Sequence, residues 1–393
     1  MKRGLIIAVL IFAGLGAAYI AVSPGRPFIA SLFFPSDLTE KEILDKHNNG
    51  GRLRILVVPG HDNEFPGAEY RDLREADLTL KIGKYLFDYL KTNPRLDPGL
   101  ARDDKGYAPT LARYFEDGKD NIKTFIKNAR QFFNNLVSSD KIEKSEPPFY
   151  RSKANSKTIL RLYGINKWAN DNKVDIILHL HLNNYEDRGK NNIYSGFSIY
   201  VPEGQMPNYE ASKPIAEALK NVFIRHWPAS NLHLEKDTVI EDPDLIALGS
   251  YGSLRSASVL VEYGYIYEPR FRLEAGLKQA AFLTYYGLLS YLGRGDQPAL
   301  YEYGWLFPYE WRGSAAFSDK NSEAVAVLQI ALQKLGFYPP KGGNLYGCPV
   351  SGDFQTCTLK ALSAFQSYYN IYGELGTVGP KTQEKLRELG IIR

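Results

Sequence analysis

The sequence predicts an α/β fold, in which helices cover the faces of a sheet, followed by a small helical module. Between residues 52 and 292, short apolar runs of strand type alternate with segments of helical periodicity. Such alternation is typical of a sheet with helices packed on it. From residue 319 to the end, the apolar residues recur at helical spacing. The length of 393 residues suits two or three folded units.

The strands and helices of the central region follow from periodicity. The run Leu53 to Val58 is short and apolar and ends at the turn Pro59-Gly60. Glu75 to Leu90 has helical periodicity, and its shared apolar face consists of Leu78, Ile82, Tyr85, Leu86 and Tyr89. Further strands are expected at Val174 to Leu182, Gly196 to Val201 and Ser258 to Val261, and further helices at Ile215 to Phe223 and Leu273 to Leu292.

A polar segment at about 105–155 interrupts this alternation and reads as an insertion in a domain that spans 51–292. It contains a helix, Asn121 to Leu136, and a loop, Ser138 to Pro148. The insertion is either a lid over the site or an excursion on the surface, and we expect the excursion.

The N-terminus predicts an exported protein. Residues 1–23 begin with Lys2 and Arg3 and continue with 19 mostly apolar residues, about the length of a membrane-spanning helix. The basic residues come first, so the rest of the chain is expected outside the cytoplasm. An uncleaved transmembrane anchor is favoured, and a cleaved signal segment with secretion is the alternative. Residues 24–50 read as a linker with a short helix.

Aromatic residues fall on every second position of a second linker, 293–318. They are Tyr301, Tyr303, Trp305, Phe307, Tyr309 and Trp311. In an extended chain all six point the same way. They form either a platform for sugar rings or an aromatic face docked on a domain, and we expect the docked face.

The last unit, 319–393, contains a short motif that occurs twice, which we call the echo. Gly352-x-Phe354-x-x-x-Thr358 recurs as Gly376-x-Val378-x-x-x-Thr382. In each copy the threonine starts a helix, where its hydroxyl is expected to cap free N–H groups. Cys348 and Cys357 flank the first copy, and outside the cytoplasm they are expected to form a disulfide, with two buried thiols as the alternative.

Composition excludes several classes of function. The net charge is +4, from 48 basic and 44 acidic residues, which is too small for a nucleic-acid binder. Two cysteines exclude a disulfide scaffold and an all-cysteine zinc site, whereas six histidines allow a site of histidine and carboxylate ligands.

Five residues stand at strand ends or at a helix start. His61 follows the first strand, Glu75 begins a helix, and His179 and His181 end the apolar strand from Val174. Glu262 follows the strand Ser258 to Val261. Together they supply the three ligands of a catalytic zinc site and a carboxylate that is not a ligand.

Four blocks of this region occur in an order known from one family. They are Val57-Val58-Pro59-Gly60-His61 with Gly67-Ala68 and Glu75, then Arg161 to Asn170, Asp175 to Asn183, and Val259 to Tyr265. They resemble the zinc-dependent N-acetylmuramoyl-L-alanine amidases, which cut the bond between the lactyl group of muramic acid and the stem peptide of peptidoglycan. The resemblance implies a mixed sheet flanked by helices and the same hydrolase activity.

The resemblance also implies roles for the site residues. One Zn²⁺ per chain would be held by His61, Glu75 and His181, and Glu262 would be the catalytic acid and base. His179 is expected beside the site as a supporting donor or an oxyanion contact. The C-terminal unit is similar to the three-helix peptidoglycan-binding domain, through Leu328-Gln329, Leu335-Gly336, Phe365-Gln366 and both copies of the echo. The expected partners are therefore peptidoglycan and the membrane, and not nucleic acid.

The sequence departs from the family pattern near the first histidine. Val58 replaces the usual aspartate, and Asp62 and Asn63 replace glycines. These departures motivate a second hypothesis, a cell-wall binder whose site has decayed. A third is a zinc peptidase that cuts another amide of the wall.

Overall fold

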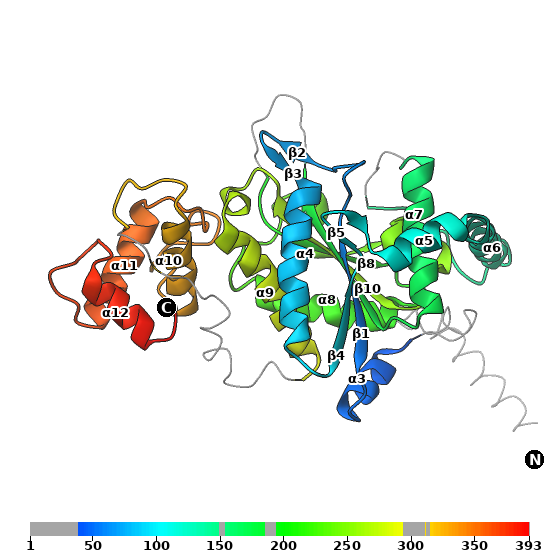
Figure 1. Ribbon diagram of the computed structural model, residues 1–393, viewed down its shortest axis with the longest axis horizontal. Coiled ribbons are helices and arrows are strands. Elements are labelled where there is room, and N and C mark those ends of the chain that lie inside the picture. Colours follow the sequence, from blue (N-terminus) through cyan, green and yellow to red (C-terminus); the bar gives the residue numbers. More distant parts are fainter. Residues whose placement is uncertain (1–37, 149–153, 185–193, 294–310, 312–314, 393) are drawn as a thin grey trace, which may run out of the picture.

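The computed structural model describes residues 38–148, 154–184, 194–293, 311 and 315–392. It contains an α/β domain and a helical domain, which adjoin where α10 (Glu323–Lys334) meets α9 (Glu274–Tyr291) (Figure 1). The predicted anchor, residues 1–23, lies outside the described residues. Within the described ranges, no helix has both the length and the apolar character to cross a membrane.

A six-stranded sheet forms the centre of the α/β domain, in the order β4-β1-β7-β10-β8-β9. All neighbouring strands are parallel except β10 and β8, which are antiparallel. The sheet is therefore mixed, as predicted. Its strands are β1 Leu53–Pro59, β4 Leu96–Leu100, β7 Ile176–Asn183, β8 Ser198–Pro202, β9 Val239–Asp242 and β10 Ala257–Tyr265.

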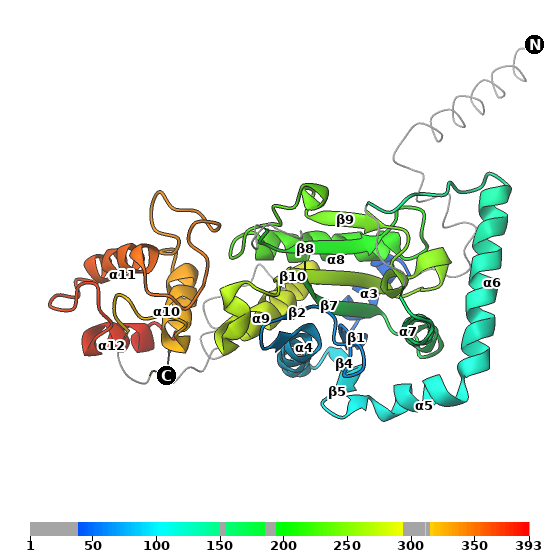
Figure 2. The same cartoon turned by 90° about the horizontal axis from the view of Figure 1, so that it is seen from above.

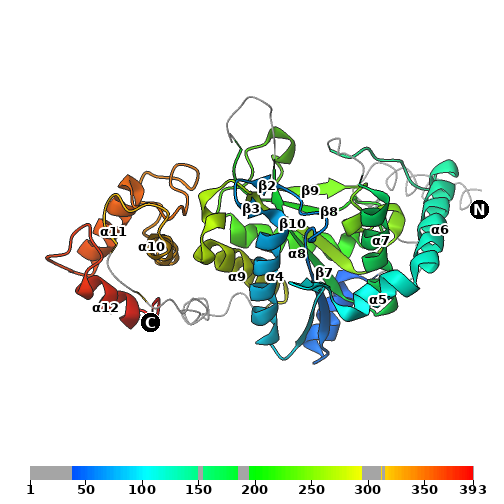
Figure 3. The same ribbon diagram turned by 45° about the horizontal axis from the view of Figure 1, so that its top comes forward.

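Helices cover both faces of this sheet, because the buried side chains of its strands point both ways. On one face lie α4 (Glu75–Lys91), α8 (Tyr209–Phe223) and α9, whose apolar residues form the largest core with Val57, Leu178 and Val261 (Figure 1). On the other face lie α7 (Ser156–Asp171) and the short turns η2 (Ile246–Leu248) and η3 (Ser250–Gly252) (Figure 3). The short helix predicted in 24–50 is α3 (Glu40–Asn48).

The edge strands β4 and β9 were not predicted, and β10 is longer than predicted. The sequence of β4, Leu-Asp-Pro-Gly-Leu, contains a proline that only an edge strand tolerates. The predicted strand ended at Val261, but β10 continues to Tyr265 through an irregularity in its pairing with β7. Glu262 therefore lies within the strand and not beyond its end.

The insertion forms an outer layer beyond α7. It contains the hairpin of β5 (Arg102–Asp103) and β6 (Gly106–Tyr107), then α5 (Pro109–Asp117) and α6 (Lys119–Ser138) (Figure 2). Phe133 of α6 packs edge-on against Tyr251 of η3. The two helices thus rest on the α7 side of the domain.

The helical domain consists of α10, α11 (Thr356–Tyr368) and α12 (Pro380–Glu388) around one core. Cys348 and Cys357 form the expected disulfide. Trp311 is buried in this core, whereas the other five aromatics of the linker lie outside the described residues.

A buried glutamine organises each copy of the echo, and the predicted threonine caps are wrong. Gln329 donates to the Thr358 hydroxyl and accepts from the Gly352 N–H. Gln366 does the same with Thr382 and Gly376. The threonine hydroxyls are engaged by these glutamines. The N-cap residues of α11 and α12 make no side-chain cap hydrogen bond, and the Glu374 carboxylate caps α12 by accepting from the N–H groups of Lys381 and Thr382, both at 2.9 Å.

The two domains share a polar and apolar interface. The Glu323 carboxylate accepts the backbone N–H groups of Glu274 and Ala275, at 3.0 and 2.6 Å, and so caps α9 from the other domain. Gln333 accepts from the Gln279 side chain at 3.0 Å. Leu273 and Ala275 also belong to the core of the helical domain, so the two domains share apolar as well as polar contacts.

Candidate metal centre

Three predicted residues meet at the carboxyl ends of β1 and β7. Nε2 of His61 lies 3.1 Å from one carboxylate oxygen of Glu75, and Nδ1 of His181 lies 3.0 Å from the other. One ligand atom from each of the three residues lies within 4.8 Å of the others. The His61 side chain is 34% exposed and that of Glu75 only 4%, so the group opens to solvent on the His61 side.

Two glycines leave the space in which these side chains meet. Gly60 stands against His181, and a Cβ there would lie 2.5 Å from its Cε1. Gly67 has a φ of +77°, and a Cβ there would lie 2.5 Å from Oε2 of Glu75 and 2.5 Å from Cδ2 of His61. These distances are shorter than the contacts that Cβ atoms make in folded proteins. The Gly-His and Gly-Ala pairs of the sequence are therefore required by the packing of the site.

Glu75 begins α4 and is held as a carboxylate. Its oxygens accept the N–H groups of Ala68 at 2.9 Å and Leu182 at 3.1 Å, in addition to the two imidazoles. Burial alone would raise its pKa, but the hydrogen bonds to His181 and His61 outweigh burial and hold the pKa well below its usual range. The site therefore keeps one fixed negative charge.

The two imidazoles differ in their proton affinity. Burial lowers the pKa of His181, and the bond to Glu75 compensates only in part. Burial also opposes charge on His61, but its hydrogen bond to Glu75 and the attraction of that carboxylate together raise the pKa. His181 is thus the more readily deprotonated of the two, which is the form that binds a metal.

A buried arginine supports the site from behind. Arg102 is 3% exposed, and its guanidinium donates to the carbonyls of Pro59, Gly60 and Ala76. It thereby joins the end of β1 to the first turn of α4, the two segments that carry His61 and Glu75. The sequence offered no signal for this role, because every acceptor except the Thr79 hydroxyl is a backbone carbonyl.

Asp62 fixes the loop that carries His61. One of its oxygens accepts the N–H groups of Glu64 and Phe65, both at 2.9 Å. The other accepts from the Tyr107 hydroxyl at 3.1 Å and from the Arg161 guanidinium at 2.8 Å. A residue that departs from the family pattern therefore ties the loop to the insertion and to α7.

Glu262 and His179 lie on the same face of the sheet as His181. Glu262 is the register partner of His181 on the neighbouring parallel strand β10. Side chains of paired residues on parallel strands project to the same face, as do residues two apart on one strand. His179 is 1% exposed, and burial lowers its pKa to about 3, so it is neutral. It lies against the backbone of Ala247 and is not among the three grouped ligands.

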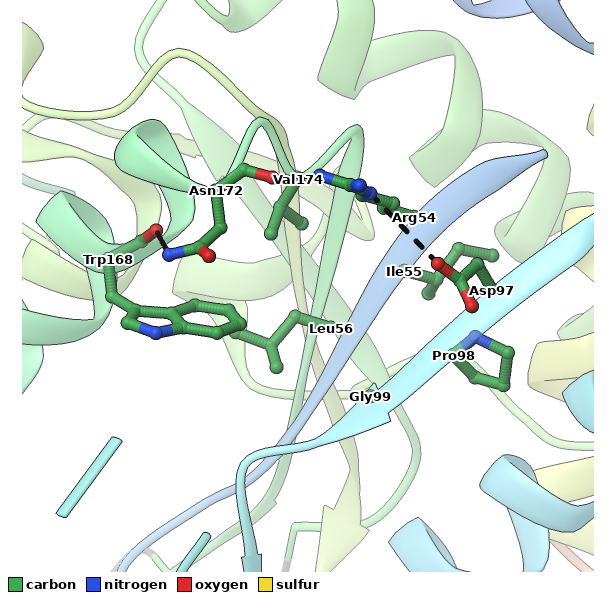
Figure 4. A pocket seen from close by; sticks show the side chains of 9 residues that line it. All are labelled: Arg54, Ile55, Leu56, Asp97, Pro98, Gly99, Trp168, Asn172 and Val174. Atoms are coloured by element: carbon green, nitrogen blue, oxygen red, sulfur yellow. Dashed lines mark hydrogen bonds and ion pairs between the residues drawn. The ribbon is translucent and has the colours of Figure 1, made fainter. Parts of the chain in front are cut away.

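A separate cavity of about 270 Å³ lies toward the opposite end of β1 (Figure 4). Arg54 and Asp97, which are paired on the neighbouring strands β1 and β4 and lie 4.0 Å apart, line one side of it, and Trp168 of α7 lines the other. Arg54 is near the start of β1, whereas His61 follows its end, so this cavity does not belong to the metal centre.

Sequence comparison agrees with the geometry. The model of the N-acetylmuramoyl-L-alanine amidase family matches residues 55–273, more than half of the chain. The chain belongs to this family. A peptidoglycan-binding domain matches residues 321–386 of the amidase, over the three helices of the C-terminal domain. The amidase therefore carries its hydrolase region and a wall-binding domain on one chain.

Solved amidase structures resemble this amidase at low identity. The CwlD amidase of Clostridioides difficile, solved in complex with the GerS lipoprotein, is 16% identical, with a TM-score of 0.41. The match covers 62% of this chain and 99% of that one. AmiC2 of Nostoc punctiforme is 18% identical over 62% of this chain and 99% of that one, with a TM-score of 0.40. No curated protein matched the sequence.

Proposed function

We propose that this amidase is a zinc-dependent hydrolase of the amide between the lactyl group of N-acetylmuramic acid and L-alanine in peptidoglycan. The observation that carries the proposal is the convergence of His61, Glu75 and His181 on one point. The family match supports the bond that is cut, and the peptidoglycan-binding domain supports the polymer.

The donor set suits zinc. Zn²⁺ binds histidine nitrogens at about 2.0–2.1 Å and carboxylate oxygens at about 2.0–2.2 Å, so its ligand atoms must lie within about 4 Å of one another. The three ligand atoms here lie within 4.8 Å, which a small adjustment closes. A set of three protein ligands is also that of a catalytic site, which keeps one position open.

When bound, the zinc supplies Lewis acidity toward the amide carbonyl and toward water. The other steps belong to side chains. Glu262, beside His181 on β10, takes a proton from the attacking water and delivers it to the departing nitrogen of L-alanine. The carbon–nitrogen bond breaks as the hydroxyl joins the lactyl carbonyl carbon. Glu75 keeps its negative charge throughout, because its pKa is low.

The setting in the cell and the division of the chain are part of the proposal. We place the enzyme outside the cytoplasm, anchored through residues 1–23, with 51–292 as the hydrolase domain and 319–393 as the wall-binding domain. The disulfide between Cys348 and Cys357 supports an oxidising compartment. The C-terminal domain would raise the local concentration of substrate.

The test is product analysis with purified peptidoglycan. The wild-type protein should hold about one zinc per chain and release free stem peptides. Glu262→Gln should keep the zinc and lose at least about 100-fold in rate, the scale of a general acid–base group. Glu210→Gln on α8 is the matched control and should stay active.

Three outcomes would overturn parts of this proposal. A wild-type protein that holds zinc but releases nothing would be a wall binder with a decayed site. Cut cross-links in place of free stem peptides would indicate a peptidase. Full activity of Glu262→Gln would remove Glu262 from the mechanism and leave the bond specificity standing.

A further inference from the structure

A second cavity lies between the two domains of the amidase. Its volume is about 260 Å³. Tyr194, Pro228 and Tyr267 line it from the α/β domain, and Leu345, Tyr346 and Pro349 line it from the helical domain. Neither domain alone completes the cavity, and none of the three metal ligands lines it.

The walls of this cavity are fixed in place. Glu268 accepts the N–H groups of Gly196 at 3.0 Å and Tyr265 at 2.8 Å, and it forms an ion pair with Arg270. The Arg270 guanidinium lies over the Trp227 ring, 4.4 Å from its centroid. On the other side, the Tyr346 hydroxyl donates to the Ala229 carbonyl at 2.7 Å and ties the wall of the helical domain to the α/β domain.

A contact between two tyrosines leads from the cavity toward the metal centre. Tyr267 stands edge-on to Tyr70, with ring centroids 5.9 Å apart, and Tyr70 is two residues from Ala68, which donates to Glu75. Tyr267 also follows Glu262 by five residues along the chain, a span of at most about 17 Å. A polymer bound at the cavity can therefore reach the metal centre within a few of its own units.

The chemistry of the walls favours a sugar over a peptide. Tyrosine and proline rings offer flat apolar surfaces, which pack on the C–H faces of a pyranose ring, and the volume is near the lower end of that of ligand sites. The charged residues Glu268 and Arg270 neutralise each other, so the cavity presents no single charge for a charged stem peptide.

We propose that this interdomain cavity is a glycan subsite, which holds a sugar of the peptidoglycan strand while a neighbouring muramic acid lies at the metal centre. Residues of both domains would contact the sugar. The proposal rests on the proposed function and deepens it, because it names the glycan as the part of the substrate that the interdomain cavity recognises.

The test measures binding without catalysis. The probe is the β-1,4-linked tetramer of N-acetylglucosamine, which has no lactyl amide to cut, so the result is independent of zinc and of the amidase proposal. The full chain is titrated with the tetramer by calorimetry. Tyr194→Ala and Tyr346→Ala should each raise Kd about 5- to 10-fold, as expected for the loss of one aromatic contact. Tyr346→Phe keeps the ring but loses the hydrogen bond to the Ala229 carbonyl, so its Kd should lie between those of wild type and Tyr346→Ala.

Tyr372 offers a matched control. Tyr372 is 67% exposed on the helical domain and lies outside the cavity, so Tyr372→Ala should bind as wild type does. The proposal fails if the wild type does not bind the tetramer. It also fails if only Tyr346→Ala weakens binding, which would place the grip on the helical domain alone. Binding of a free stem peptide at these tyrosines without binding of the tetramer would equally overturn it.

Discussion

Replacement of Gly67 by alanine should remove the metal while leaving most of the fold intact. Gly67 has a φ of +77°, and the added Cβ would lie 2.5 Å from a Glu75 oxygen and 2.5 Å from Cδ2 of His61. These contacts are about 1 Å inside ordinary van der Waals distance. One or both side chains must therefore move by roughly that amount.

The size of the effect follows from two separate costs. The left-handed backbone costs a non-glycine residue about 1–2 kcal/mol, which for a domain of this size lowers Tm by about 2–8 °C. Displacement of the ligands adds a second cost that falls on metal binding, since ligand positions tolerate only about 0.2 Å. Loss of support for one ligand typically weakens metal affinity by about 10- to 100-fold, and here two ligands are displaced.

Gly50→Ala separates these two costs. Gly50 has a φ of +87°, and a Cβ there would meet nothing within 4 Å. Gly50→Ala should therefore lower Tm by a similar amount and bind zinc as wild type does. Zinc affinity is measured by competition with a chromophoric chelator, and Tm by calorimetry of the metal-free proteins. Wild-type zinc affinity in Gly67→Ala would refute the claim that the ligands need the space beside this glycine.

Three further changes probe the support of the site and the contact between the domains. Arg102→Leu should lower the free energy of unfolding by about 2–3 kcal/mol, because three backbone carbonyls lose a charged donor. Denaturant titration measures this loss, and Arg102→Lys should recover part of it. Glu323→Ala removes the carboxylate that caps α9 from the other domain, at a cost of about 1 kcal/mol. The radius of gyration in solution scattering should increase, and an unchanged value would show that the apolar contacts suffice to hold the domains together. Burial lowers the pKa of His226 to about 4, so the unfolded chain binds more protons between that value and 6.5. Stability is therefore full above about pH 6.5 and should fall by up to about 3 kcal/mol as the pH drops toward 4, whereas His226→Gln should flatten this dependence.

The sequence predicted the parts of the fold that are buried on both faces. The strands β1, β7 and β10 are apolar almost throughout, so their periodicity was plain. The edge strands carry proline or acidic residues and looked like loops. Periodicity reports burial, and edge strands are buried too little to be recognised by it.

The strand ends and the helix start predicted a site of histidine and carboxylate ligands, and the resemblance to the amidase family selected His61, Glu75 and His181 for it. Arg102 and Asp62 were missed, since their partners are backbone groups or residues far along the chain. The threonines of the echo misled the prediction for a related reason. A threonine at a helix start often caps it, but here a glutamine from the preceding helix engages the hydroxyl.

The capping of α9 by Glu323 has a consequence for where the polymer is cut. A wall-binding domain on a free tether would let cleavage fall anywhere within reach, whereas the contacts between α9 and α10 would hold the proposed glycan subsite and the proposed metal centre at one separation. With both proposals in place, the enzyme would cut the polymer at a set distance from the point where it is bound.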